Sequence, residues 1–183
     1  MHFPHSEIPR SSQKRRLSQL VLGCINLLHT KRKRKHQKVD EVVVLAEESL
    51  QTIVQHANIL ANAVNHTKDL ANTPPCDMTT EEVAAAALKL QESGVEVTIW
   101  GRKELEEQKM GGIIGVGQGS AQEPKLVVMK HLRGEGKPII FVGKGITYDT
   151  GGLNIKPDMH MSNMKMDMHG GATVIGILKA VSE

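Results

Sequence analysis

Apolar residues recur every three or four positions across residues 47–71, which is the spacing of one face of an α-helix. We therefore expect a long amphipathic helix here. The two prolines after Thr73 end it, because proline lacks a backbone N–H and disfavours helical geometry in the residue before it. Thr79 and Glu82 have the spacing of a capping box that opens a second helix. Gly94 closes that helix, as glycine commonly does at helix ends.

Short apolar and β-branched runs predict the strands. Residues 95–100 alternate β-forming and polar side chains, and a helical pattern follows them. Strands therefore alternate with helices, which is typical of an α/β domain with a mainly parallel sheet flanked by helices. The other predicted strands are residues 42–45, 126–132 and 139–142, and the other predicted helices are residues 102–109 and the stretch that begins at Gly170.

Positive charge is concentrated at the start of the chain. Residues 1–40 hold ten Lys or Arg and two acids, whereas the remainder holds thirteen Lys or Arg and eighteen acids. A length of 183 residues with 39% hydrophobic content allows one domain of ordinary size with part of another. Nucleic-acid binding through the basic run at residues 31–35 is a distant alternative function. The chain has one Trp, one Tyr and two Phe for base stacking, which weighs against single-strand binding.

Cysteine usage indicates a reducing compartment. Cys24 and Cys76 are far apart and form no Cys-x-x-Cys pair, so neither a disulfide framework nor a thiolate zinc site is indicated. The apolar stretch at residues 17–28 contains polar residues, lacks a small-residue cleavage site and is too short to span a membrane. We expect a cytoplasmic protein with no membrane partner.

The densest group of reactive side chains lies in a glycine-rich loop after the predicted strand at residues 139–142. Lys144, Asp149 and Lys156 lie in this loop, and Asp167 follows it. In open α/β sheets, reactive groups collect on loops beyond the carboxyl ends of strands. We therefore expect these four side chains to come together.

Carboxylates are hard donors, and one carboxylate can bridge two divalent ions held about 3.5–4 Å apart. A lysine beside such ions can lose its proton and become a ligand, or stay charged and stabilise an oxyanion. Composition alone also allows an ordinary solvated loop. A phosphate-binding loop does not fit, because Gly145 rather than Ser or Thr follows Lys144.

The loop resembles the signature of a known family. The run VGKGITYDTGGLNIK at residues 142–156, followed by MKMDM at 164–168, is similar to the signature of the leucyl aminopeptidases, the cytosol aminopeptidase family of two-metal exopeptidases. Two further segments resemble motifs of that family in the same order. They are DLANTPP at 69–75, which looks like the entry into its catalytic domain, and MGGIIGVGQGS at 110–120, which looks like its internal glycine-rich loop.

The resemblance implies a role for each candidate site residue. Lys144 would be a metal ligand through its amine, Asp149 a carboxylate that bridges both ions, and Asp167 a further metal ligand. Lys156 would be the catalytic residue that polarises the scissile carbonyl and steadies the tetrahedral intermediate. Met164 would lie in the pocket that binds the first side chain of the substrate.

The resemblance also implies the organisation and the reaction. Residues 1–46 would be a remnant of the N-terminal domain, residues 47–71 a linking helix, and residues 72–183 a partial catalytic domain. Two divalent ions, Mn²⁺ or Zn²⁺ with Mg²⁺ or Co²⁺ as alternatives, would activate water. This water would release N-terminal amino acids of the leucine type from peptides with a free N-terminus. Full-length relatives are expected to form homo-hexamers.

One family motif has no counterpart in this sequence. The second family signature, NTDAEGRL, supplies further carboxylates to the metals and lies beyond Glu183 by the family's order. We therefore expect a C-terminally truncated member that carries the first half of the active site and is inactive alone. The alternative is a catalytically dead fragment or a product that acts only by binding. His169 stands where the family usually has a small residue; we assign it and His160 surface or supporting roles.

Overall fold

The computed structural model describes residues 50–183. The chain divides into two compact units, residues 1–65 and residues 66–183. The predicted basic segment over residues 1–46, with its strand at residues 42–45, lies outside the described residues. The predicted division into three segments stays a prediction.

Helix α2 spans Gln51–Asn72 and confirms the helix predicted from the apolar periodicity. The helix ends at Asn72, close to the two prolines that predict its end. The Thr73 N–H and the Thr73 Oγ1 both donate to the Asp69 carbonyl, at 3.1 and 2.7 Å. The following turn is closed by the Asp77 and Met78 N–H groups, which donate to the Pro74 carbonyl at 2.9 and 2.8 Å.

Helix α3 spans Thr80–Leu88 and continues into the 3₁₀ helix η2, Lys89–Ser93. Thr79 is its N-cap: the Thr79 hydroxyl accepts a hydrogen bond from the Glu82 N–H at 3.4 Å, which satisfies an otherwise unpaired helix donor. Gly94 ends η2 with φ +80°, a left-handed conformation that favours glycine. Both ends of this helical stretch therefore agree with the sequence prediction.

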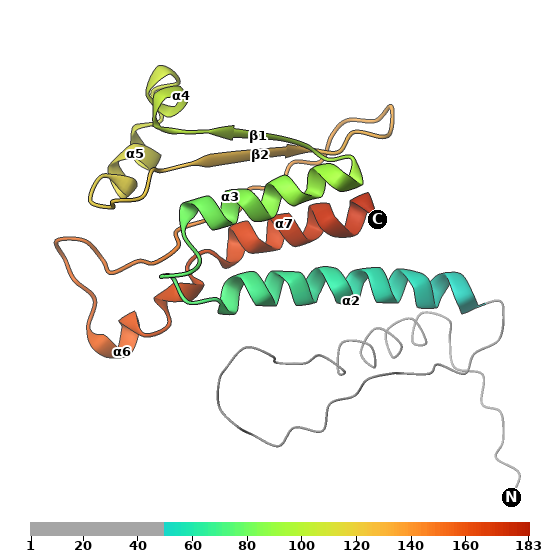
Figure 1. Cartoon of the computed structure of the whole chain (residues 1–183), viewed down its shortest axis with the longest axis horizontal. Helices are drawn as coiled ribbons and strands as arrows, with labels where there is room; N and C mark the ends of the chain where they lie inside the picture. Colours follow the sequence, from blue (N-terminus) through green and yellow to red (C-terminus); the bar gives the residue numbers. More distant parts are fainter. Residues whose placement is uncertain (1–49) are drawn as a thin grey trace, which may run out of the picture. The chain divides into compact units, whose positions relative to one another are not determined.

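Strands β1 (Glu96–Trp100) and β2 (Leu126–Lys130) form a two-stranded sheet, and they run antiparallel. This corrects the expected parallel pairing, although the α/β class itself is confirmed. The segment between the strands folds at one end of the sheet as helices α4 (Arg102–Glu107) and α5 (Gly111–Gly117), as Figure 1 shows. Because this segment does not cross the face of the sheet, β2 returns in the opposite direction.

The glycine-rich motif at residues 110–120 is helical over α5, although its resemblance to a glycine-rich loop predicts no helix there. The Ile113 and Ile114 N–H groups both donate to the Met110 carbonyl, at 3.1 and 3.3 Å, and start the helix. Glycine has low helix propensity, so local contacts rather than propensity set this conformation.

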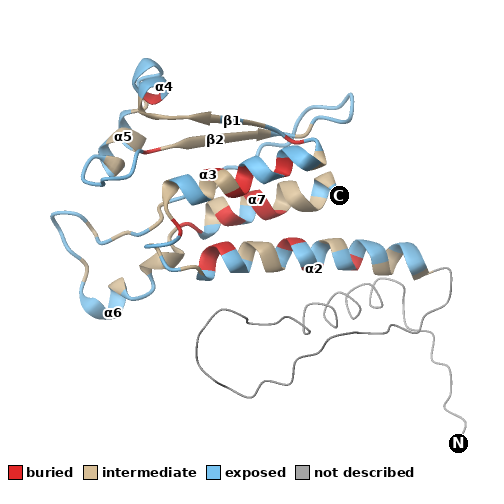
Figure 2. Cartoon of the chain, viewed as in Figure 1, coloured by how far each residue is buried: buried red, intermediate tan, exposed pale blue. Residues whose placement is uncertain are grey.

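The core of residues 66–183 lies between the sheet, α3 and helix α7 (His169–Ser182) (Figure 1). Small side chains let α3 and α7 approach closely: Ala87 and Ala172 are fully buried, and Ile175 of α7 is 2% exposed. Figure 2 shows buried positions in red on both α3 and α7. The remaining buried members of this core are Leu70, Ala71, Met78, Ala86, Leu90, Val95 and Met168.

The predicted strand at residues 139–142 is not part of the sheet. Ile139, Ile140 and Val142 are 81%, 80% and 93% exposed, and the described residues place no strand beside this run. A β-forming run acquires strand structure only through pairing, so the sequence preference alone does not produce a strand here. The segment therefore reaches the candidate site as extended chain.

Between this run and α7 lie the short helix α6 (Asp158–Met161) and the 3₁₀ turn η3 (Met164–Met166). The turn η3 holds Met164, Lys165 and Met166 of the motif at 164–168. Within residues 50–183, no helix has the length and apolar character needed to cross a membrane.

Candidate active site

The loop that carries Lys144 is held against the first turn of α7. The Gly171 N–H donates to the Lys144 carbonyl at 2.7 Å. A Cβ placed on Gly143 would lie 2.3 Å from the Gly170 carbonyl oxygen, so glycine at 143 is what permits this approach. This backbone contact brings Lys144 to the end of η3, where Asp167 lies.

Lys144 and Asp167 form an ion pair, with 2.8 Å between Lys144 Nζ and Asp167 Oδ2. The Lys144 side chain is about half exposed, whereas that of Asp167 is mostly buried. Asp167 Oδ2 is itself shielded from solvent, and no group of the described residues approaches it in good hydrogen-bond geometry. The contact is therefore an ion pair without the alignment of a hydrogen bond. A buried carboxylate oxygen thus faces one amine and has spare capacity to accept a cation.

Asp149 and Lys156 form a second pair, with 3.3 Å between Lys156 Nζ and Asp149 Oδ2. The other oxygen, Asp149 Oδ1, accepts the Gly151 N–H at 2.8 Å, which closes a tight turn. Gly151 has φ +92°, and a Cβ there would lie 2.4 Å from the Asn154 carbonyl oxygen. Only glycine fits this turn, and the turn orients the carboxylate toward Lys156.

The electrostatics of these groups link the two pairs. The pKa of Lys144 is raised above its ordinary value, first by contact with the Asp167 carboxylate and then by the charge of Asp149. The pKa of Asp149 is lowered, first by the Gly151 N–H and then by Lys156, with a smaller effect from Lys144. Lys144 and Asp149 therefore lie close enough for each to sense the charge of the other, and the four predicted side chains form one cluster.

Met164, the predicted substrate-pocket residue, begins η3 and is half-buried. Its carbonyl accepts the Asp167 N–H at 3.2 Å, so the turn that holds Asp167 also fixes the backbone of Met164. Met164 and the Asp167 carboxylate therefore belong to the same turn. Its role as a pocket residue stays a prediction.

The donor set of the cluster fits a divalent cation. Asp149 and Asp167 supply hard oxygens, and the shielded Asp167 Oδ2 lacks an aligned donor from the described residues. Lys144 becomes a third donor if its amine loses its proton. Within residues 50–183, no three His, Cys, Asp or Glu side chains gather as a metal site, so two carboxylates are the acidic donors of this cluster.

Sequence reasoning missed the residues that hold the cluster in place. Gly170 and Gly171 contact the backbone of Gly143 and Lys144, and the consecutive glycines before a helical pattern were the available signal. Tyr148 is a further supporting residue, because its hydroxyl donates to the Met161 carbonyl at 3.3 Å. That bond ties the loop to α6.

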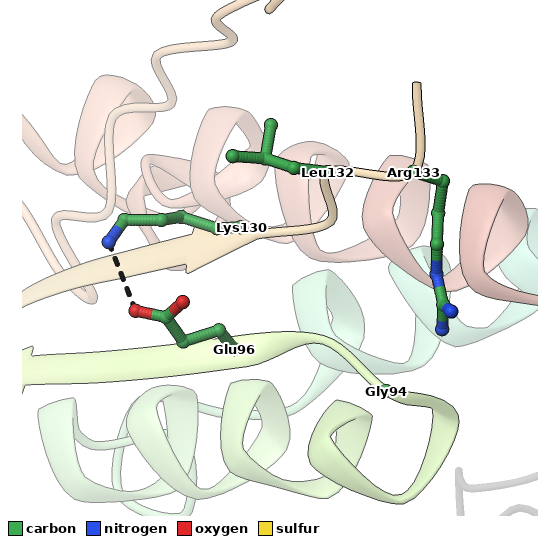
Figure 3. Close-up of a pocket in the computed structure, with 5 residues that line it drawn as sticks. All are labelled: Gly94, Glu96, Lys130, Leu132 and Arg133. Carbon is green, nitrogen blue, oxygen red and sulfur yellow. Dashed lines mark hydrogen bonds and ion pairs between the residues drawn. The ribbon is translucent and has the colours of Figure 1, made fainter. Parts of the chain in front are cut away.

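A surface pocket of about 270 Å³ lies elsewhere, at the end of the two-stranded sheet where β1 begins and β2 ends. Figure 3 shows that Glu96 and Lys130 face each other there, and their charged atoms are 3.0 Å apart. The pocket shares no residue with the lysine and carboxylate cluster, and its two facing charges satisfy each other. We therefore assign the chemistry to the cluster. Gly94, Leu132 and Arg133 complete the lining.

Comparison with known proteins identifies a family for this chain. The model of the cytosol aminopeptidase family, catalytic domain, matches residues 65–183. A probable cytosol aminopeptidase of Pseudomonas fluorescens is 43% identical over 142 residues, which are 75% of this chain and 29% of the relative.

Two solved structures are similar to this chain. The cytosol aminopeptidase of Coxiella burnetii has a TM-score of 0.79 and 28% identity, and the match covers 92% of this chain and 35% of that one. The bottromycin maturation enzyme BotP in complex with manganese has a TM-score of 0.78 and 29% identity, with 98% and 38% covered. This chain thus spans about a third of the length of the proteins it matches. Because the family model matches more than half of the chain, the chain belongs to the cytosol aminopeptidase family, which it matches through the catalytic domain.

Proposed function

We propose that this chain contributes to a two-metal aminopeptidase that releases N-terminal amino acids, of the leucine type, from peptides. The proposal rests on two ion pairs in a member of this family. Lys144 pairs with Asp167, and Lys156 pairs with Asp149. A cytoplasmic location and peptide substrates with a free N-terminus are part of the proposal. Homo-hexamer formation, implied for full-length relatives, stays a prediction.

Lys144, Asp149 and Asp167 are the residues that would hold the metal ions. The chemistry supplied by bound divalent ions is acidification of a water molecule and polarisation of a carbonyl. The similarity to a manganese complex supports a divalent ion and leaves Mn²⁺, Zn²⁺, Mg²⁺ and Co²⁺ as candidates. In the structure Lys144 is held in its charged form by Asp167, so its amine must release a proton to become a ligand.

Lys156 would stabilise the negative charge that develops on the carbonyl oxygen of the substrate. Its side chain is about 29% exposed and its amine is paired with Asp149, so the positive charge of Lys156 is held in place within the cluster. A preorganised charge of this kind stabilises a transition state without reorganising during the reaction. Asp149 would serve as a metal ligand, and Lys156 would then direct its charge toward the substrate oxygen.

Met164 would contribute to the pocket for the first side chain of the substrate. A flexible thioether suits an apolar pocket that accepts a leucine-like group. Its backbone is fixed through Asp167, so the proposed pocket wall and the proposed ligand are parts of one turn.

We also propose that the 183-residue chain binds metal weakly and hydrolyses no peptide by itself. The cluster offers two carboxylates and the Lys144 amine as metal ligands, and the chain spans 29% of its Pseudomonas fluorescens relative. A function limited to binding is the second candidate, favoured by the exposed apolar run at residues 139–142.

Manganese titration of the chain tests the ligand assignment. Asp149→Asn and Asp167→Asn should each weaken Mn²⁺ binding by about tenfold or more, because each removes a hard anionic donor. Asp158→Asn is the matched control, since it removes the same charge from an exposed position at the start of α6, and it should leave the affinity within about twofold. Equal losses in all three variants would show a general charge effect and contradict the assignment.

A further inference from the structure

Methionine is strongly concentrated next to the candidate active site. Five of the nine methionines in the chain occur between residues 159 and 168, interleaved with His160 and followed by His169. Thioether sulfur and imidazole are softer donors than the carboxylates of the cluster, and soft donors select different metal ions. The five methionines are Met159, Met161, Met164, Met166 and Met168.

The backbone from Asp158 to Asp167 winds in the right-handed helical sense. After α6, Ser162 has φ −56° and ψ −29°, and its N–H donates to the Asp158 carbonyl at 3.2 Å. Asn163 has φ −94° and ψ −1°, and η3 then closes with the Asp167 N–H on the Met164 carbonyl. Residues three and four apart therefore lie on the same side of this segment.

This geometry puts His160, Met161 and Met164 on one face. His160 and Met164 are four residues apart, and Met161 and Met164 are three apart, which are the spacings that bring Cβ atoms to about 5–6 Å in a continuous helix. His160 is exposed, while Met161 and Met164 are half-buried. Met159 and Met166 fall on other sides by the same spacing.

This face is anchored to the rest of the domain. The Tyr148 hydroxyl donates to the Met161 carbonyl at 3.3 Å, and Met168, just beyond η3, is 1% exposed in the core. An anchored segment loses less conformational freedom when it binds an ion than a free loop does.

We propose that His160, Met161 and Met164 form a binding site for a soft monovalent cation, Cu⁺. Two thioethers and one imidazole provide three neutral donors, and thioether ligands select Cu⁺ over hard divalent ions. Its donor atoms differ from those of Lys144, Asp149 and Asp167, which are suited to hard divalent ions. The proposed Cu⁺ site does not depend on the proposed hydrolytic function. Excess Mn²⁺ should therefore leave bound Cu⁺ in place.

Competition with a chromophoric Cu⁺ chelator under anaerobic, reducing conditions tests the proposal. The experiment uses the full chain with the substitutions Cys24→Ser and Cys76→Ser, so that thiols do not compete for the ion. One equivalent of Cu⁺ should bind, and Met161→Leu and Met164→Leu should each weaken binding by about tenfold or more. Leucine keeps the volume of methionine, so these variants should stay folded, which circular dichroism checks. Met159→Leu is the control and should leave the affinity within about twofold.

Nuclear magnetic resonance of methyl-labelled methionine identifies the ligands directly, with Ag⁺ as a redox-stable probe. The Met161 and Met164 methyl signals should shift, and those of Met159 and Met166 should not. Equal chelator competition by the parent chain and the Met161→Leu/Met164→Leu double variant would overturn the proposal. Shifts confined to other methionines, or displacement of Cu⁺ by Mn²⁺, would overturn it as well.

Discussion

Lys144 Nζ lies 2.8 Å from Asp167 Oδ2, although the two residues belong to separate parts of the chain, the loop after residue 142 and the end of η3. The contact exists because the backbone around Gly143 packs directly on the first turn of α7. The cluster is therefore held together by main-chain packing as much as by charge.

The pKa of Lys144 reports this geometry. Asp167 is the main cause of its elevation and Asp149 a smaller one. Asp167→Asn should thus lower the pKa of Lys144 toward its ordinary value of 10.5, and Asp149→Asn should lower it less. Titration of the lysine side-chain signals by NMR measures the change. Asp158→Asn should have no effect, and a Lys144 pKa that responds equally to all three changes would contradict the arrangement.

Gly143 should be intolerant of a side chain. Its Cβ would meet the Gly170 carbonyl at 2.3 Å, so Gly143→Ala should destabilise the domain by about 1–3 kcal/mol through forced displacement of the α7 start. Gly145→Ala is the control, because a Cβ there meets nothing within 4 Å. Urea denaturation of the two variants measures the difference. Equal stability of the two would show that the loop is not held as described.

His66 should make stability depend on pH. Its pKa is lowered from 6.5, first by burial and then by Lys179, with Lys89 acting in the same direction and Asp69 opposing. A histidine with a depressed folded pKa takes up its proton first in the unfolded state, so stability falls as pH drops below about 6.5 and levels off below the folded pKa. Urea midpoints between about pH 5 and 7.5 should show a flatter dependence in His66→Gln. An unchanged slope would exclude His66 as the cause.

The exposed apolar run at residues 139–142 should cause self-association. Ile140 is 80% exposed in a β-forming segment, and unpaired segments of this kind pair with other chains. Ile140→Lys should therefore lower the associated fraction in light scattering without reducing the free energy of unfolding. Glu135→Lys adds a positive charge outside the run and should have little effect. Equal improvement by both variants would indicate a response to net charge alone.

The sequence predicted the parts of the fold that local rules decide. Helix α2 followed from its apolar periodicity, and Thr79 and Gly94 marked both ends of the next helical stretch. Contacts between distant residues were harder to predict. The antiparallel pairing of β1 with β2 depends on where α4 and α5 lie, and the run at residues 139–142 stays outside the sheet for want of a neighbouring strand within residues 50–183.

In the candidate site, too, the sequence predicted the residues but not the long-range contacts that hold them. Lys144, Asp149, Lys156 and Asp167 were predicted to come together from their order and spacing, and the structure brings them into two linked ion pairs. The contact of Gly143 with Gly170 was not predicted, because it joins backbone atoms of segments that the sequence does not show to be neighbours. Residue identity indicates the chemistry, whereas the packing of α7 determines its geometry.

A chimera tests the central claim most directly. Residues 65–183 of this chain would replace the matching segment of the Pseudomonas fluorescens relative, so that the cluster is studied within a full-length protein. The account predicts manganese-dependent hydrolysis of leucine amide by the folded chimera. It further predicts a loss of about 10²–10³ in kcat on Lys156→Ala and little change on Lys137→Ala, an exposed lysine outside the cluster. A folded, manganese-bound chimera without hydrolysis, or one unaffected by Lys156→Ala, would contradict it.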